Sequence, residues 1–117
     1  MKPRSYQNLI VWQKGFNVAN HLYEITRSFP SDEKFGLVSQ MRRAAVSIPS
    51  NIAEGCERRS PGDLRRFLHI ALGSLSELET QLLLSQHQGY ITPTTFSTIQ
   101  NELNEVGRLL HCFIKKT

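Results

Sequence analysis

Paired arginine residues are the feature of this sequence best suited to binding chemistry. A guanidinium group binds phosphate and carboxylate oxygens through two parallel hydrogen bonds and stays charged at physiological pH. Four such side chains flank one predicted turn and a fifth belongs to an earlier pair; the candidates are Arg42, Arg58, Arg59, Arg65 and Arg66. The pattern predicts a corner that binds nucleic acid, with a purely solvated basic corner as the alternative. It does not distinguish RNA from DNA.

A second set of polar residues recurs at helical spacing through the segment 40–58 and reappears at the edge of the next apolar stripe. One interpretation is ordinary solvated surface. The other is a partly buried network that sets the register between two helices or two subunits. We favour the network and predict that its members are Gln40, Arg43, Asn51, Glu54, Glu77 and Gln81.

Signatures of catalysis and metal binding are missing from the sequence. The segment Gly73-Ser74-Leu75-Ser76 lies within a predicted helix and lacks the closing glycine of a nucleophile elbow. No phosphate loop or dinucleotide fingerprint is present, and no glutamate has a histidine three residues later, as a di-iron bundle requires. The two cysteines form neither a disulfide framework nor a zinc motif. We therefore expect no catalytic residues, no metal, no cofactor and no small-molecule substrate.

Four segments with helical periodicity must position these side chains. Apolar residues recur every three or four positions, no strand signal is sustained, and the predicted helices span about 6–28, 32–59, 61–88 and 93–115. Ser60-Pro61 and Thr92-Pro93 each place a capping side chain before a proline that fits the first helical position. The short connections predict an all-α chain folded as an antiparallel up-down four-helix bundle.

Pro49 lies in the middle of the second predicted helix. The apolar stripe that contains Ile48 and Ile52 keeps its helical phase on both sides of the proline. An interior proline costs about 3 kcal/mol or more, whereas burial of the two isoleucines recovers roughly 3–6 kcal/mol. We therefore predict one continuous helix that is kinked at Pro49, with a true break as the alternative.

The second helix is also apolar over more of its circumference than a core-facing helix needs. The residues that widen this mostly apolar face are Arg42, Val46, Pro49 and Ala53. Apolar surface beyond the core stripe indicates a second contact, and in a small bundle the partner is usually another copy of the protein. We predict an oligomer interface on this face; a wider core contact within one chain is the alternative.

Length and composition indicate one domain covering residues 1–117, because 117 residues with 39% hydrophobic side chains can fill one core but hardly two. The net charge of +4 permits an anionic partner without requiring one. No apolar run approaches the roughly 20 residues that span a bilayer, and the N-terminal apolar run is too short for a signal peptide. We expect a cytoplasmic protein that does not contact a membrane.

Three stretches carry a family resemblance: NLIVWQKG, FPSDEKFGLVSQMRRAAVSIPSNIAEGCERRS and RRFLHIALGSLSELETQL. Over roughly residues 8–90, in order and spacing, they resemble the four-helix bundle family of proteins encoded in 23S ribosomal RNA intervening sequences. Gly15 and Gly62 depart from the pattern, since alanine and a longer polar residue are more usual there. The resemblance implies an up-down bundle that assembles as a ring, a homopentamer.

The resemblance also implies kinship with the accessory variability protein of diversity-generating retroelements, a basic pentameric barrel that binds a reverse transcriptase and nucleic acid. It implies no established enzymatic activity. Together with the arginine pairs, it predicts a non-enzymatic oligomeric bundle that binds structured RNA or a ribonucleoprotein partner. The alternatives are a protein–protein scaffold without nucleic-acid contact, and an enzyme built on Arg43, Glu54 and Glu77, which would need strongly shifted pKa values in a closed pocket.

Overall fold

The computed structural model describes residues 5–117 and is all-α, with four helices and no strand in that range. The helices are α1 (Ile10–Thr26), α2 (Leu37–Cys56), α3 (Pro61–His87) and α4 (Pro93–Lys115). Two short 3-10 turns, η1 (Ser5–Asn8) and η2 (Ser31–Glu33), precede α1 and α2. The prediction of an all-α chain with four helices is confirmed.

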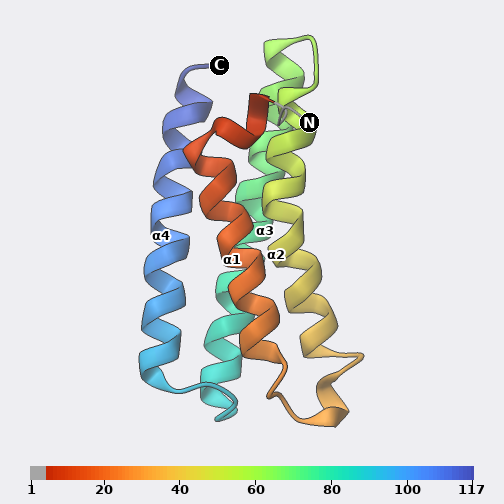
Figure 1. Cartoon of the computed structure of the whole chain (residues 1–117), viewed down its shortest axis with the longest axis vertical. Coiled ribbons are helices and arrows are strands. Elements are labelled where there is room, and N and C mark those ends of the chain that lie inside the picture. Colours follow the sequence, from red (N-terminus) through yellow and green to blue (C-terminus); the bar gives the residue numbers. More distant parts are fainter. Residues whose placement is uncertain (1–4) are drawn as a thin grey trace.

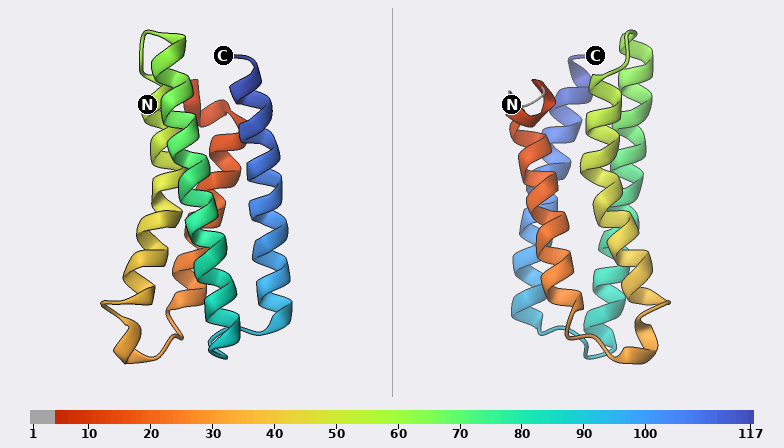
Figure 2. Two further views of the ribbon diagram at one scale, coloured as in Figure 1. Left: turned by 180° about the vertical axis from the view of Figure 1, so that it is seen from behind. Right: turned by 45° about the vertical axis from the view of Figure 1, so that its right-hand side comes forward.

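The four helices lie side by side along the long axis of a molecule that measures 43 × 29 × 20 Å. In Figure 1, α1 and α3 run down the view, whereas α2 and α4 run up it. The further views in Figure 2 agree, and each helix packs against two neighbours, so that α1 contacts α2 and α4 while α3 contacts the same two. The end of α2, the start of α3 and the end of α4 therefore meet at one end of the molecule.

Helix α2 continues through Pro49, which lies buried inside it. Ile48 and Ile52, on either side of the proline, are fully buried, as their shared helical phase predicts. Helix α1 approaches this part of α2 closely, because a Cβ added to Gly15 would lie 3.3 Å from Cγ2 of Ile48 and 3.7 Å from the nitrogen of Pro49. The break is therefore absent, and the kink itself stays a prediction.

The predicted caps of α3 and α4 are confirmed. The hydroxyl of Ser60 accepts a hydrogen bond from the Asp63 backbone N–H at 3.1 Å, and that of Thr92 accepts one from the Thr95 N–H at 3.1 Å. Each hydroxyl satisfies a backbone donor that has no partner within its own helix.

The predicted starts of α1 and α2 need correction, since these helices begin at residues 10 and 37 rather than near 6 and 32. Leu9 is extended, with φ −77° and ψ 130°, and separates η1 from α1. Gly36 has φ −109° and ψ −107°, which no α-helix contains, so the acidic residues before it form η2 instead. The side chain of Glu33 still accepts the Leu37 N–H at 3.3 Å, at the positive end of the α2 dipole.

The ends of the first two helices are also earlier than predicted. Helix α1 ends at Thr26 rather than 28, and α2 ends at Cys56 rather than 59. Ser60 is extended, with φ −107° and ψ 142°, because a residue before proline disfavours the helical conformation. The residues between Cys56 and Ser60 must therefore leave the helix to form the turn.

The core is a single cluster of apolar residues contributed by all four helices, and the fully buried ones include Leu22, Met41, Ile48, Ile52, Leu78, Leu82, Leu103 and Leu110. Helices α2 and α3 approach each other closely at Gly55. A Cβ added to this glycine would lie 3.0 Å from Cβ of Phe67 and 3.3 Å from the carbonyl oxygen of Leu64.

We expect Gly55→Ala to lower the free energy of unfolding by about 1–3 kcal/mol, because the added methyl group forces α2 and α3 apart. The matched control is Gly73→Ala in α3, where an added Cβ meets no atom within 4 Å. This second exchange should raise stability by about 1 kcal/mol, since alanine favours the helix over glycine. Urea unfolding followed by circular dichroism measures both. Equal stability of Gly55→Ala and the wild type would contradict the close approach.

Candidate nucleic-acid interface

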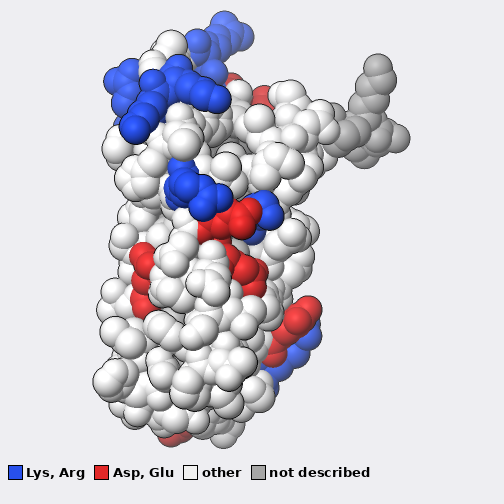
Figure 3. All heavy atoms as spheres, turned by 90° about the vertical axis from the view of Figure 1, so that its left-hand side faces the viewer, with Lys and Arg blue, Asp and Glu red and all other residues white. Residues whose placement is uncertain are grey.

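Basic side chains gather at the end of the molecule where α2, α3 and α4 meet. Figure 3 shows Lys and Arg side chains concentrated at this end, at the top of the view. We call it the basic end; its cations are Arg58, Arg59, Arg65, Arg66, Lys115 and Lys116. With the neighbouring acids Glu54, Glu57 and Asp63, these side chains give it a formal charge of +3, out of +4 for the whole chain.

Two of the predicted arginines are held against an aromatic ring. The guanidinium carbons of Arg58 and Arg66 lie 4.9 Å and 4.5 Å from the centre of the Phe67 ring. Arg58 also donates to Oε1 of Glu54 at 2.6 Å, and Arg66 lies 3.7 Å from Asp63. Stacking on the ring restricts both guanidinium groups while leaving them exposed. The half-buried Phe67 ring is thus engaged by the two arginines, which makes it a poor platform for a base.

The other two arginines of this turn differ in their contacts. Arg65 donates from Nε to the Thr117 hydroxyl and from Nη2 to the Thr117 carbonyl oxygen, both at 3.1 Å. These bonds join the start of α3 to the chain beyond α4. Arg59 is exposed and makes no hydrogen bond or ion pair with any described residue, so its charge is fully available to a ligand.

A cavity of about 310 Å³ opens between these chain segments. Half-buried side chains of Cys56, Leu64 and Phe113 contribute apolar surface to it, and Arg59 and Lys116 are among the cations that line it. Burial raises the pKa of the Cys56 thiol, and the negative charge of Glu57 raises it further. The thiol is therefore neutral at physiological pH and acts as apolar surface rather than as a nucleophile.

Arg42 is the one predicted nucleic-acid residue that the structure does not bring to the basic end. It lies about 21 Å along α2 from Cys56, where that helix ends. Its Nε donates to the Thr26 hydroxyl at 2.9 Å, its Nη2 donates to the Tyr23 carbonyl at 3.3 Å, and its guanidinium lies 4.5 Å from the Tyr23 ring centre. The cation thus compensates the negative end of α1.

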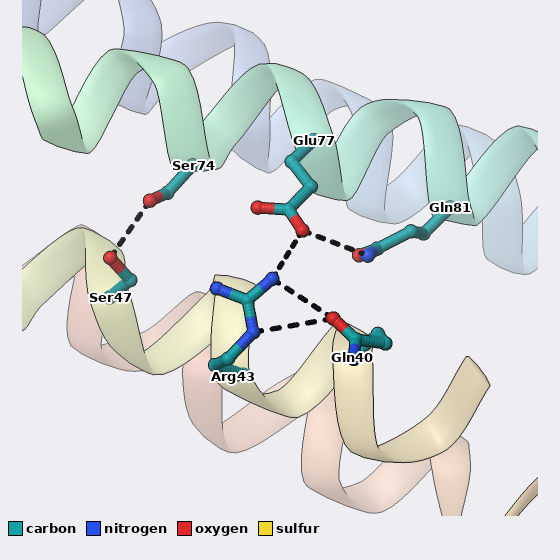
Figure 4. Close-up of polar contacts among 6 residues, drawn as sticks. All are labelled: Gln40, Arg43, Ser47, Ser74, Glu77 and Gln81. Carbon is teal, nitrogen blue, oxygen red and sulfur yellow. Dashed lines mark hydrogen bonds and ion pairs between the residues drawn. The ribbon is translucent and has the colours of Figure 1, made fainter. Parts of the chain in front are cut away.

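The predicted polar network forms only in part, as Figure 4 shows. Arg43 pairs with the carboxylate of Glu77 and donates to Gln40 Oε1 at 3.0 Å, while Gln81 Nε2 lies 3.4 Å from Glu77 Oε2. This group links α2 to α3. Because the Arg43 and Glu77 side chains are 57% and 38% exposed, the pair is worth at most about 1 kcal/mol.

The other two predicted members of the network do not reach α3. Asn51 donates to the Ser47 carbonyl at 2.7 Å, and Glu54 pairs with Arg58, which lies in the turn after α2. Glu54 is therefore separate from Arg43 and Glu77. A link that the sequence did not reveal joins the hydroxyls of Ser47 and Ser74 at 2.8 Å, across the same helix pair.

The predicted oligomer face contains two open grooves: the smaller lies between α1 and α2, and the larger runs along α2 next to Tyr23 and Phe35. One has a volume of about 590 Å³ and the other about 260 Å³, and both are lined by Val46 and Ser50. Of the predicted interface residues, Val46 is 39% exposed and Ala53 is half-buried, whereas Pro49 is buried and Arg42 is engaged with α1. Large apolar side chains along the two grooves remain exposed: Phe16, Tyr23, Phe35 and Val46.

Residues 5–117 contain no group of three or more His, Cys, Asp or Glu side chains that could hold a metal ion. None of the helices in this range has the length and apolar character needed to cross a bilayer.

Comparison with known proteins gives the family of this chain. A family model described as the 23S rRNA-intervening sequence protein matches residues 7–112. The chain belongs to this family. A crystal structure of an S23 ribosomal protein family member of unknown function, from Bacteroides thetaiotaomicron, is similar to it at 30% sequence identity. That likeness has a TM-score of 0.84 and covers 91% of this chain and 96% of the other.

The sequence prediction of this family, made from residues 8–90, is thus confirmed over a longer range that includes most of α4. No curated protein matches the chain.

The neighbouring arginines of α2 give a test of the contacts described above. We expect Arg42→Met to lower the free energy of unfolding by about 1–3 kcal/mol, because hydrogen bonds from a half-buried charge are lost. Arg43→Met should cost less than about 1 kcal/mol, since its ion pair is exposed. Thermal or urea unfolding compares the two variants directly. A larger loss for Arg43→Met would show that the polar group in Figure 4, rather than the Arg42 contacts, holds α2 in place.

Proposed function

We propose that this protein binds structured RNA, free or within a ribonucleoprotein, through the basic end. The observation that supports this proposal is the concentration of charge: this one end carries +3 of the total formal charge of +4. Its cations come from the ends of three helices, so that phosphates of one folded RNA could contact all three. The description of the family refers to the intervening sequences of 23S rRNA, so rRNA is the ligand to test first.

The affinity of such a surface comes mainly from release of the counterions that surround the RNA backbone. Arg59 and Lys116 should contribute most, because neither is paired with an acidic side chain among the described residues. Arg58 and Arg66 already interact with Glu54 and Asp63, so part of their charge is compensated before RNA arrives. No catalytic step is required by this function.

Replacing Arg59 and Lys116 by alanine should therefore weaken binding to an rRNA fragment and reduce the salt dependence of the binding constant. Each lost phosphate contact is expected to lower the slope of log K against log salt by about 1. Fluorescence anisotropy over a salt series measures both effects. Arg27→Ala is the matched control, since this exposed arginine lies at the opposite end of the bundle.

The proposal fails if the wild-type protein does not bind rRNA fragments at low salt, or if binding is unchanged by the double substitution. A scaffold that contacts only other proteins is the alternative, and the exposed apolar grooves along α2 favour it. Capture of partners from a lysate with and without nuclease separates the two functions. Partners that remain bound after nuclease treatment, together with absent RNA binding, would establish the scaffold.

We also propose that copies of the chain associate through the α1–α2 face, as the ring assembly implied by the family resemblance requires. Exposed aromatic and aliphatic side chains support this surface, with Phe35 89% exposed. A bend of α2 at Pro49, where the carbonyl of Ala45 loses its N–H partner, would adapt the face to a neighbouring copy. The expected assembly is a pentamer, with five times the 13.4 kDa mass of one chain.

A charge placed in this face should dissociate the assembly. We expect Val46→Arg to reduce the mass measured by light scattering toward that of one chain, because the arginine must be desolvated at the interface. Ile70→Arg is the matched control, since Ile70 on α3 is 41% exposed, close to the 39% of Val46. A wild-type protein that is monomeric at micromolar concentration would refute the assembly, and equal dissociation by both variants would refute its location.

A further inference from the structure

The cavity at the basic end has apolar surface beside its cations, which binding to phosphates alone does not explain. Its lining combines the cations Arg58, Arg59 and Lys116 with carbon and sulfur surface from Cys56, Leu64 and Phe113. None of the described residues that line it is acidic. From this combination we propose that the cavity receives one unpaired nucleotide of the bound RNA, an inference that rests on the proposed function.

The positive side chains around the cavity suit the phosphates of that nucleotide. Arg59 is exposed without a partner among the described residues, and Lys116, which follows the end of α4, lines the same cavity. Both cations are exposed and can contact a phosphate at the cavity. The guanidinium of Arg58, restricted by Phe67 and Glu54, offers a more fixed donor beside them.

The interior of the cavity suits a base. Leu64 and Phe113 are half-buried, and the Cys56 thiol is neutral, so that a flat aromatic group can cover apolar surface there. A phosphate alone would gain nothing from these side chains. The volume of about 310 Å³ lies at the lower end of the range of roughly 300–1,000 Å³ that is typical of small-ligand sites.

The cavity can receive a base only from some forms of RNA. In an A-form duplex the bases are stacked inside and the deep major groove is too narrow for side chains to read. Only a base that has left the stack, in a loop, a bulge or a strand end, can enter a cavity in the protein surface. The expected ligand is therefore RNA with an unpaired nucleotide beside a folded segment, and not a continuous duplex.

Two RNA probes with equal numbers of phosphates test this inference by fluorescence anisotropy: a stem–loop and a blunt duplex. We expect Cys56→Leu, which fills the cavity without changing its charge, to weaken stem–loop binding roughly 5- to 150-fold, the equivalent of one stacked base. Its affinity for the duplex should not change. Cys112→Leu is the matched control, because Cys112 is exposed on α4 outside the cavity. Circular dichroism confirms that both variants fold.

A second measurement uses the wild-type protein, so its result does not depend on whether a variant folds. Adenosine monophosphate should shift the NMR amide signals of Cys56, Leu64 and Phe113, whereas inorganic phosphate should shift only those near the cations. Equal effects of the two probes would overturn the inference, because no base would be bound. The inference would also be overturned if an acidic peptide, and not the nucleotide, shifted the amide signals of the residues that line the cavity.

The outcomes distinguish this inference from the function on which it rests. Absence of binding to both RNA probes at low salt would reject the proposed function itself. Equal binding of stem–loop and duplex, with no loss in Cys56→Leu, would reject the cavity as a nucleotide site while RNA binding through the basic end stands. Weaker stem–loop binding in Cys56→Leu alone, with Cys112→Leu unchanged, supports both.

Discussion

Close packing of α2 against both of its neighbours is the constraint on which the rest of the structure depends. Gly15 lets α1 approach α2 beside Pro49, and Gly55 lets α2 approach α3 beside Leu64. Without a Cβ at these two points, the helices can bury Ile48 and Ile52 completely. The burial offsets the cost of an interior proline, so that α2 remains one helix over its whole length.

The position of the basic end follows from that packing. Because α2 and α3 lie close together up to the turn between them, Arg58 in that turn and Arg66 in α3 reach the same Phe67 ring. Lys115 and Lys116 add charge from α4, where the negative end of the helix dipole stabilises cations. Six cations can therefore lie together because the aromatic ring, three acids and the helix dipole reduce their mutual repulsion.

Three surfaces of α2 have separate roles in this arrangement. One is buried in the core, one carries the polar contacts of Arg43 and Ser47 to α3, and one lines the groove that it forms with α1. The Arg43–Glu77 pair is weak because it is exposed, whereas the hydrogen bond between Ser47 and Ser74 is partly buried. The proposed self-association and the proposed RNA binding therefore use different side chains.

The sequence by itself determined the four helices, the caps at Ser60 and Thr92, the core stripe through Pro49 and the family, because helical phase and capping are local properties of the chain. Only the tertiary structure decided which polar side chains meet. In the folded chain Arg42 contacts α1, Asn51 and Glu54 do not reach α3, and Arg59 and Lys116 line one cavity. Which long side chains pair depends on the distances between residues on neighbouring helices, and the sequence pattern alone does not give those distances.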